Sequence, residues 1–480
     1  MTVDRGSLFI DGGWVAPSTS SRITVLNAAT EEVLGTVPLA DVADVDRAVA
    51  AARNAAEKSA WSQASPADRA AAMTRFADEL QKRSGELART VSQENGMPIG
   101  LSEAFEGGFA IGLLRYYADL AATMSVEDVR PSQMGLQTVV RRSPAGVVAA
   151  IVPWNYPVVL AMSKIAPALA AGCSVVVKPS PPATVLDWFI VAEAVEAAGI
   201  PPGVINWVPG GPDVGAYLVS HPGVDKVAFT GSTAAGRSIA TVCAGLLRPV
   251  TLELGGKSAA ILLDDVDMDA IMPSLQFITF MNNGQTCVTC SRILAPAGRY
   301  DEMVDSLATR VAMLRVGDPL DPNTEIGPMA TADHRDRVER YIEKGRGEAR
   351  LVAGGGRPKG IDKGWFVEPT VFAYMTNDAT IAQEEIFGPV LSVIPYEDEA
   401  DAVRIANDSA YGLGGTVFSA DTERAKNIAR QVHTGTIGIN GYPVAIGSPF
   451  GGVKDSGLGR EFGPEALNGY LNLKSMYIAG

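Results

Sequence analysis

The sequence predicts an α/β protein with two doubly wound, Rossmann-like domains and a small additional β element. From residue 146 onward, short apolar runs alternate with helical segments of about ten to fifteen residues. This alternation is typical of right-handed βαβ units and a parallel sheet. A chain of 480 residues, 47% of them hydrophobic, is also long enough to form two or three domains with large cores.

Five apolar runs predict the first domain. They are rich in Val, Ile and Phe, as buried parallel strands are, and cover 146–152, 174–178, 204–208, 226–232 and 249–254. The same pattern resumes with runs at 258–263, 291–295 and 391–396, separated by helices predicted through about residue 284 and over 301–314. The second set of runs predicts a second α/β domain.

The two ends of the chain have different patterns. Before residue 124 the sequence is predicted to be mostly helical, with helical patterns over 44–61 and 68–96. Residues 136–144 and 471–480 have strand patterns but few evident partners in their own domain. Because unpaired strand edges invite another chain, these two segments are candidates for pairing across a subunit interface.

Composition and charge exclude several classes of protein. The net charge of −14 disfavours a nucleic-acid-binding surface, and four cysteines in 480 residues are too few for a disulfide framework. The chain shows neither an N-terminal apolar segment of the signal-peptide type nor an apolar run of about 18 residues. We therefore expect a cytoplasmic protein that binds neither nucleic acid nor membranes.

The stretch MNNGQTCVTC holds Cys287 and Cys290 as a C-x-x-C pair, which is compatible with zinc binding, redox chemistry or a nucleophile. A structural zinc site needs about four ligands, but the other two cysteines stand alone and the three histidines form no pair, so we predict no metal site. A thioredoxin-type pair lies at a strand-to-helix turn of a small domain, whereas this stretch follows a helical segment in a long chain. Both thiols could be buried hydrophobes, but Gly284 and Gln285 leave the backbone open to a substrate, which favours a nucleophile.

A second candidate site is the turn FTGSTAAG at 229–236, where an apolar run passes into a helix. Gly231 and Ser232 at a helix N-terminus offer backbone N–H groups and a favourable dipole to a diphosphate. The spacing is neither G-x-G-x-x-G nor a P-loop, and such a turn is at least as often only a helix cap. The turn alone leaves both interpretations open.

Taken together, the motifs of this chain resemble those of the aldehyde dehydrogenase superfamily. They occur in the order SLFIDGGWV, PWNYP, KPSP, FTGSTAAG, LELGGKS, GQTC, EEIFGP and SPFGGVKDSGLGRE. The cysteine of GQTC follows the glutamate of LELGGKS by 34 residues. The resemblance covers nearly the whole chain and implies an NAD(P)-dependent, non-phosphorylating oxidation of an aldehyde to an acid.

The resemblance implies three catalytic residues: Cys287 as the nucleophile, Glu253 as the general base and Asn155 as the oxyanion donor. The chemistry agrees with these residue types. A thiolate adds to an aldehyde carbonyl, and the oxyanion that develops needs preorganised donors such as an amide and a backbone N–H. Hydride transfer leaves a thioester, and base-activated water then releases the acid. Cys290 would be a bystander.

The resemblance also implies a cofactor, NAD, held by residues from several motifs. These residues are Trp154, Lys178, Ser180, Gly231, Ser232, Glu385 and Phe387. The family commonly has a glutamate at the position of Pro181, and that glutamate takes the hydroxyls of the adenine ribose. Because proline has neither an acceptor nor a charge in its side chain, NADP stays open as an alternative, and we expect weak discrimination between the two cofactors.

The recognisable pocket motifs contain no arginine or acid to pair with a charged substrate, so we expect an uncharged, apolar aldehyde. Ser163 stands where the family often has an aromatic residue, which predicts a roomy tunnel mouth. The other predicted lining residues are Tyr156, Val159, Thr286, Val288 and Phe450. Two alternatives are a CoA-acylating semialdehyde dehydrogenase, which does not require Glu253, and a catalytically silent binding or structural relative.

The resemblance finally implies how the chain is divided. We predict an NAD(P)-binding domain of 1–123 and 144–252, and a catalytic domain of 253–444. Residues 124–143 and 445–480 are predicted to form an oligomerisation element. The expected assembly is a homodimer or a homotetramer.

Overall fold

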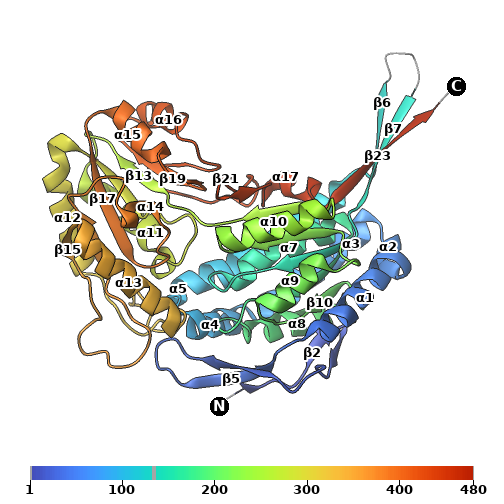
Figure 1. Ribbon diagram of the computed structural model, residues 1–480. Helices are drawn as coiled ribbons and strands as arrows, with labels where there is room; N and C mark the ends of the chain where they lie inside the picture. The colour runs from blue at the N-terminus through green and yellow to red at the C-terminus, as the bar shows by residue number, and fades with distance from the viewer. Residues whose placement is uncertain (1–2, 132–136, 479–480) are drawn as a thin grey trace.

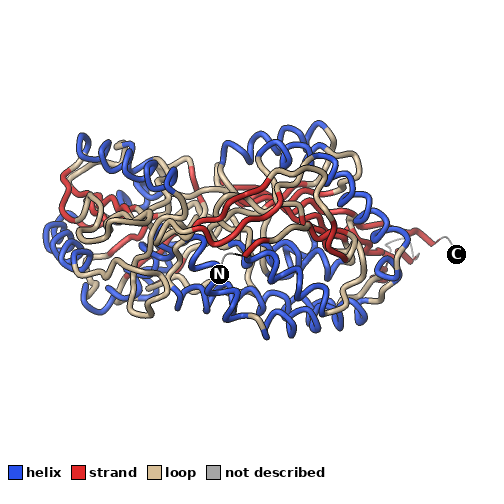
Figure 2. The backbone as a smooth tube through the Cα atoms, turned by 90° about the horizontal axis from the view of Figure 1, so that it is seen from below, coloured by secondary structure: helices blue, strands red, loops and turns tan. Residues whose placement is uncertain are grey.

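The computed structural model describes residues 3–131 and 137–478, and two large sheets dominate it. Figure 1 shows two lobes, one built mainly from blue and green elements and the other from yellow and orange ones. Helices pack around the strands of both lobes (Figure 2), as expected for the α/β class. A three-stranded arm projects from the first lobe.

The sheet of the first lobe has eight strands in the order β22-β12-β11-β8-β9-β10-β2-β3. Its five parallel strands match the five predicted runs and are β8 (Val147–Ile151), β9 (Ser174–Lys178), β10 (Ile205–Trp207), β11 (Lys226–Thr230) and β12 (Val250–Glu253). The helices between them are α7 (Pro157–Ala171), α8 (Asp187–Ala197), α9 (Pro212–Ser220) and α10 (Thr233–Gly245). The chain runs outward from β8 to β10 and then crosses to the other side of β8. The carboxyl ends of β8 and β11 therefore flank a topological switch point, where ligands bind in such sheets.

The N-terminal region is less helical than predicted. It opens with five short strands: β1 (Val3–Asp4), β2 (Leu8–Ile10), β3 (Gly13–Val15), β4 (Arg22–Leu26) and β5 (Val33–Pro38). The helices that follow are α1 (Val42–Lys58), α2 (Ala60–Gln63), α3 (Pro66–Lys82), α4 (Ser84–Asn95), α5 (Ile99–Ser102) and α6 (Ala110–Thr123). The pattern over 68–96 is split into α3 and α4 at Arg83. A π-helical turn, Glu103–Phe109, leads into α6.

The second lobe has a seven-stranded sheet in the order β15-β16-β17-β14-β13-β19-β20, parallel except for β15. The strands are β13 (Ala259–Leu262), β14 (Arg292–Pro296), β15 (Arg350–Ala353), β16 (Thr370–Ala373), β17 (Val390–Tyr396), β19 (Gly415–Phe418) and β20 (Gly438–Ile439). The helices are α11 (Met268–Phe280), α12 (Tyr300–Ala312), α13 (Ala332–Glu348), α14 (Thr380–Gln383), α15 (Glu399–Asn407) and α16 (Thr422–Ala429). Helix α11 ends at Phe280 rather than near residue 284, because Asn282 and Asn283 adopt left-handed backbone angles.

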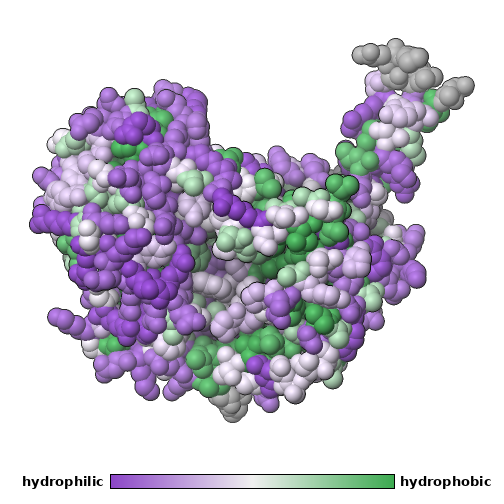
Figure 3. Space-filling view, in the orientation of Figure 1, coloured by the Kyte–Doolittle hydropathy of each residue, from purple (hydrophilic) through white to green (hydrophobic). Residues whose placement is uncertain are grey.

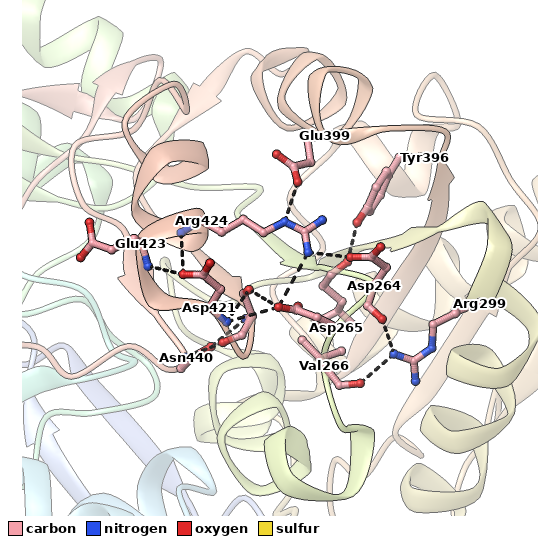
Figure 4. A network of polar contacts seen from close by, with 12 residues as sticks. Asp264, Asp265, Val266, Arg299, Tyr396, Glu399, Asp421, Glu423, Arg424 and Asn440 are labelled. Carbon is pink, nitrogen blue, oxygen red and sulfur yellow. Dashed lines mark hydrogen bonds and ion pairs between the residues drawn. The ribbon is translucent and has the colours of Figure 1, made fainter.

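A polar network fastens the outer helices of the second lobe to its sheet (Figure 4). Arg424 of α16 forms two short ion pairs. Its Nε lies 2.6 Å from Oε1 of Glu399 in α15, and its Nη1 lies 2.7 Å from Oδ1 of Asp264, which follows β13. Asp265 accepts a hydrogen bond of 2.8 Å from Ser419 Oγ. Partly exposed ion pairs of this kind contribute about 1 kcal/mol or less each. The network's role is therefore to fix the loop after β13, and none of its residues lines the cavity described below.

The arm is an antiparallel sheet of β6 (Glu127–Pro131), β7 (Gln137–Pro144) and β23 (Leu471–Ile478). Strands β7 and β23 pair along their whole length, from Leu471 opposite Pro144 to Ile478 opposite Gln137. The two segments that we expected to lack partners are thus partners of each other. Figure 1 shows the arm standing clear of both lobes. Residues 132–136 and 479–480 of the predicted oligomerisation element lie outside the described residues.

The last part of the chain returns from the second lobe to the first. It contains the short strands β21 (Val453–Lys454) and β22 (Gly457–Leu458) and the helix α17 (Gly463–Asn468). Strand β21 pairs antiparallel with β18 (Tyr411–Gly412), which lies earlier in the chain, just before β19. Strand β22 pairs antiparallel with β12 and so completes the first sheet. Over residues 3–131 and 137–478, no helix has the length and apolar character needed to cross a membrane.

Candidate active site

A cavity of about 310 Å³ lies at the carboxyl ends of β8, β11 and β12, where the first lobe faces the second. Its lining residues are Pro153, Trp154, Asn155, Thr230, Gly231, Ser232, Leu254, Gly255, Cys287, His334, Arg337, Glu385 and Phe387. The structure therefore brings together two of the three predicted catalytic residues and most of the predicted cofactor residues. Glu253, Lys178 and Ser180 are the exceptions.

The loop that carries Cys287 has an irregular backbone. Asn282 and Asn283 have φ angles of 51° and 60°, a left-handed conformation that asparagine tolerates better than most residues. Gly284 has a φ of 76°, and a Cβ there would lie 2.3 Å from the carbonyl oxygen of Gly388. The side chain of Cys287 is half-buried and lines the cavity. Burial and two nearby carboxylates raise its pKa, so forming the thiolate requires a proton acceptor.

Cys290, the other cysteine of the pair, is completely buried in the hydrophobic core of the second lobe. Burial also raises the pKa of its thiol. A buried thiol of this kind behaves as a small apolar side chain. In the part of the chain that the structure describes, no group of three His, Cys, Asp or Glu side chains could hold a metal ion.

Asn155 is held beside the cysteine loop by hydrogen bonds that it donates and accepts. Its Nδ2 donates to the carbonyl oxygen of Gln285 at 3.0 Å. The backbone carbonyl oxygen of Asn155 accepts hydrogen bonds from Asn95 Nδ2 at 3.1 Å and from Asn282 Nδ2 at 2.9 Å. All four residues are buried. These buried hydrogen bonds orient the Asn155 amide before any substrate arrives, and its nitrogen carries a second N–H that can reach an oxyanion.

Glu253 is buried but does not line the cavity. Its carboxylate is close to Gly451, where a Cβ would lie 2.4 Å from Oε1. Burial and the charge of Glu461 raise the pKa of Glu253, while Lys164 and Arg460 oppose the shift. Lys164 and Glu461 form a fully buried ion pair, 2.6 Å from Nζ to Oε1. The sequence did not indicate this pair, although Glu461 ends the last of the motifs.

We expected Ser163 to lie at the mouth of a tunnel, but the structure places it elsewhere. Its side chain is fully buried in α7. The hydroxyl is 2.7 Å from Glu461 Oε2 and 2.8 Å from the carbonyl oxygen of Leu160, and it can donate to either. A short hydroxyl is satisfied by its own helix and the neighbouring carboxylate, so Ser163 supports the buried ion pair instead.

Residues predicted to bind the cofactor form the wall of the cavity across the two lobes. Ser232 caps α10, its Oγ accepting from Ala235 N at 3.3 Å. At the preceding Gly231, a Cβ would lie 2.5 Å from the ring of Phe229, so only glycine fits there without a shift. From the other lobe, Glu385 accepts a 2.9 Å hydrogen bond from the backbone of the LELGGKS motif, and burial raises its pKa.

Lys178 and Ser180 lie beyond this cavity, at and after the carboxyl end of β9. The Lys178 side chain is nearly buried, and burial lowers its pKa to about 8, against an opposing effect of Asp213. Ser180 and Pro181 follow in a half-buried turn that leads towards α8. Because β9 neighbours β8, these residues lie farther along the same edge of the sheet.

Two residues that sequence reasoning missed, His334 and Arg337 of α13, also line the cavity. His334 Nε2 donates to the Phe387 carbonyl at 2.7 Å, and its ring lies 5.1 Å from that of Trp154. Burial lowers the pKa of His334 to about 4, so its ring is neutral at physiological pH. Arg337 donates to the carbonyl of Glu385 at 2.7 Å. Both residues lie outside every motif, so no sequence pattern distinguished them from ordinary surface residues.

Next to the cysteine loop is a group of rings that we call the aromatic cluster. Its members are Phe105, Phe109, Tyr156, Phe450 and Phe462, with neighbouring ring centroids 5.4–5.8 Å apart. The Tyr156 hydroxyl lies 3.0 Å from Thr286 Oγ1, which ties the cluster to the residue before Cys287. Val159 and Val288 are buried in the same hydrophobic core. Phe105 and Phe109 belong to the π-helical turn and were not predicted.

Comparison with known proteins gives a consistent result. Residues 14–476 match the family model described as "Aldehyde dehydrogenase family". The chain is 59% identical over 480 residues to the geranial dehydrogenase of Castellaniella defragrans, with 100% of both chains covered. It resembles the crystal structure of a Mycobacterium tuberculosis aldehyde dehydrogenase complexed with NAD⁺, with a TM-score of 0.97, 47% identity and 100% and 99% of the two chains covered. A variant of aldehyde dehydrogenase C from Pseudomonas syringae, complexed with NAD⁺ and octanal, gives a TM-score of 0.94 at 40% identity, with 98% and 96% covered.

Proposed function

The chain belongs to the aldehyde dehydrogenase family, and we propose that its substrate is a bulky apolar aldehyde. The protein oxidises an aldehyde to the carboxylic acid with NAD(P). The observation that carries the substrate proposal is the aromatic cluster, an apolar surface joined to the cysteine loop through Tyr156 and Thr286. Relatives act on or bind apolar aldehydes: one is a geranial dehydrogenase, and another structure holds octanal.

We infer that Cys287 is the nucleophile and that Asn155 and Glu253 assist it. The Cys287 sulfur bonds to the aldehyde carbon, and the carbonyl oxygen becomes an oxyanion that the Asn155 amide stabilises. Oxidation leaves a thioester on Cys287. Glu253 takes a proton from water, the resulting hydroxide adds to the thioester, and the acid leaves as the thiolate re-forms. Support for these roles comes from the shared cavity of Cys287 and Asn155 and from the raised pKa of Glu253, which makes it a stronger base.

The cavity fits the nicotinamide end of a dinucleotide. At Gly255 a Cβ would lie 2.4 Å from Glu385 Oε2, so glycine keeps this wall open. The start of α10 at Ser232 suits a diphosphate, because the helix dipole favours an anion there. Glu385 and Phe387 would hold the nicotinamide ribose and ring, and Trp154 lies in the same groove. Lys178 and Ser180 would hold the adenosine end. When bound, the nicotinamide accepts a hydride from the substrate carbon.

The proposed substrate class is tested by a panel of aldehydes, from acetaldehyde through octanal and benzaldehyde to geranial. Each is assayed with NAD and with NADP by the absorbance of the reduced cofactor. We expect kcat/KM to rise with apolar bulk and to be higher for geranial than for acetaldehyde. The proposal fails if small or charged aldehydes are the best substrates.

Replacing Phe105 with alanine should selectively impair bulky substrates. The ring lies 5.6 Å from that of Tyr156. On our proposal, its loss removes apolar contact with a long substrate. Differences of this size in an apolar pocket change kcat/KM by about 10- to 100-fold. We therefore expect such a loss for geranial and a much smaller change for acetaldehyde, with Phe105→Leu intermediate. Equal losses on both aldehydes would show that Phe105 does not contact substrate.

The exposed residues of the arm support the proposal of a homodimer or homotetramer. In the single chain, Leu473 and Tyr477 are 68% and 81% exposed, and they lie on one face of β23. Figure 3 also shows an apolar surface on the first lobe below the arm. Changing Leu473 and Tyr477 together to glutamate should give a smaller species in light scattering. Lys474→Gln, on the opposite face, should leave the mass unchanged.

Two further proposals concern where the protein acts and how its chain is divided. All four cysteines are free in the described structure, which suits the reducing cytoplasm that we propose for it. We also propose that the chain has three parts: a cofactor domain of 1–123 and 144–252, a catalytic domain of 253–444, and an oligomerisation element of 124–143 and 445–480. This division is supported by the two sheets and the arm.

A further inference from the structure

The further inference concerns the adenosine end of the dinucleotide and rests on the proposed cofactor position. If the nicotinamide end lies in the cavity and the diphosphate at Ser232, the adenosine must continue along the carboxyl edge of the sheet. Beyond Ser232 this edge is bordered by α9 and α10, which lie side by side in Figure 1. Lys178 ends the neighbouring strand β9.

Helix α9 packs directly on Lys178. At Gly215 an added Cβ would lie 3.6 Å from both Cδ and Cε of Lys178, so the lysine stem runs across this helix. The stem is buried, with the residue 5% exposed. The lysine is therefore held in place by α9, and groups at the start of α9 share its surroundings.

The first turn of α9 carries Asp213, which is exposed. Its carboxylate is turned back over the beginning of the helix, because a Cβ at Gly211 would lie 2.8 Å from Asp213 Oδ1. The negative charge of Asp213 favours the charged form of Lys178 and so opposes the effect of burial on its pKa. Helix α9 thus packs on the lysine that we assign to the adenosine site and carries a carboxylate in its first turn, two residues before that contact.

We propose that Asp213 makes the adenosine site selective for NAD over NADP, in place of the glutamate that Pro181 replaces. A carboxylate accepts hydrogen bonds from ribose hydroxyls, and it repels the charge of a 2′-phosphate. Without such a group, Lys178 would pair with that phosphate and favour NADP. The weak discrimination expected from Pro181 alone is therefore replaced by a clear preference for NAD.

The test measures binding of NAD⁺ and NADP⁺ by calorimetry, with no aldehyde present. Wild-type protein should bind NAD⁺ at least about tenfold more tightly than NADP⁺. Asp213→Asn should tighten NADP⁺ binding by about tenfold or more and weaken NAD⁺ binding by a smaller factor, because an amide keeps a hydrogen-bond acceptor but loses the charge. Asp213→Ser serves as a second variant. Asp119→Asn, which removes an exposed carboxylate from α6, should change neither affinity.

A rescue variant adds a second criterion. Pro181→Glu in the Asp213→Asn background should restore the preference for NAD⁺, because it returns a carboxylate to the position that relatives use. Unchanged NADP⁺ affinity in both Asp213 variants, with intact NAD⁺ binding, would overturn this inference and leave the proposed function standing. If the wild-type protein bound neither dinucleotide, the proposed function would fail together with the inference.

Discussion

Replacing Cys287 with alanine is expected to lower aldehyde oxidation by about 10⁴-fold or more, to the background rate. No other thiol can take its place in the site, because Cys290 is completely buried and neither Cys173 nor Cys243 lines the cavity. Binding of NAD⁺ should persist, since alanine preserves the wall of the cavity. The rate is measured by the absorbance of NADH and the binding by calorimetry.

The control for this variant is Cys290→Ser, which should keep most of the activity. This variant tests whether the two cysteines of the C-x-x-C pair act together or whether only Cys287 takes part in catalysis. Mass spectrometry after brief treatment with iodoacetamide should find the label on Cys287 in the wild-type protein. Stoichiometric zinc that disappears together with the activity of Cys290→Ser would contradict our assignment.

Local patterns predicted the central strands well but not the edges of the sheets. The parallel strands β8 to β12 are continuous apolar runs because both of their faces are buried, and such runs are visible in the sequence. Strand β2 has only three residues, too few for a periodic pattern, and its partner β10 lies far away in the chain. The pairing of β7 with β23 is also long-range, so the sequence suggested two strands but not that they join each other.

The candidate site was predictable where a residue belongs to a motif. Cys287 and Asn155 lie in short segments whose composition is distinctive. Asn95 ends α4 and Phe105 lies in the π-helical turn, and neither belongs to a motif. Only their tertiary contacts, with Asn155 and with Tyr156, give them a role. The same limit explains Ser163. The family often has an aromatic residue at this position, and that comparison predicted a lining role for Ser163. The serine hydroxyl instead contacts the Glu461 carboxylate.

The buried pair of Lys164 and Glu461 sets the surroundings of Glu253. Glu461 raises the pKa of Glu253 through like charge, after the larger effect of burial, and Lys164 acts in the opposite direction. A raised pKa makes Glu253 a stronger proton acceptor than an ordinary carboxylate once it is ionised. The expected consequence is that hydrolysis of the thioester slows as the pH falls through this raised pKa, because protonated Glu253 cannot accept a proton from water.

Replacing Glu253 with glutamine is therefore expected to slow steady-state turnover by about 10²- to 10⁴-fold, the range for a lost general base. Glutamine has nearly the same shape but cannot take the proton. If Glu253 acts only in hydrolysis, the variant should still show a rapid burst of NADH, because the thioester forms before water is needed. If Glu253 also deprotonates Cys287, whose pKa is raised, the burst itself should slow.

Stopped-flow absorbance separates these two cases, and an added nucleophile provides the control. Hydroxylamine attacks a thioester without a general base, so it should restore turnover in Glu253→Gln and have little effect on the wild-type protein. The variant should also lose the fall in hydrolysis rate at low pH, since the group that titrates is gone. Full steady-state activity in Glu253→Gln would exclude the role of Glu253. A pH profile identical to that of the wild-type protein would show that Glu253 is not the group that titrates.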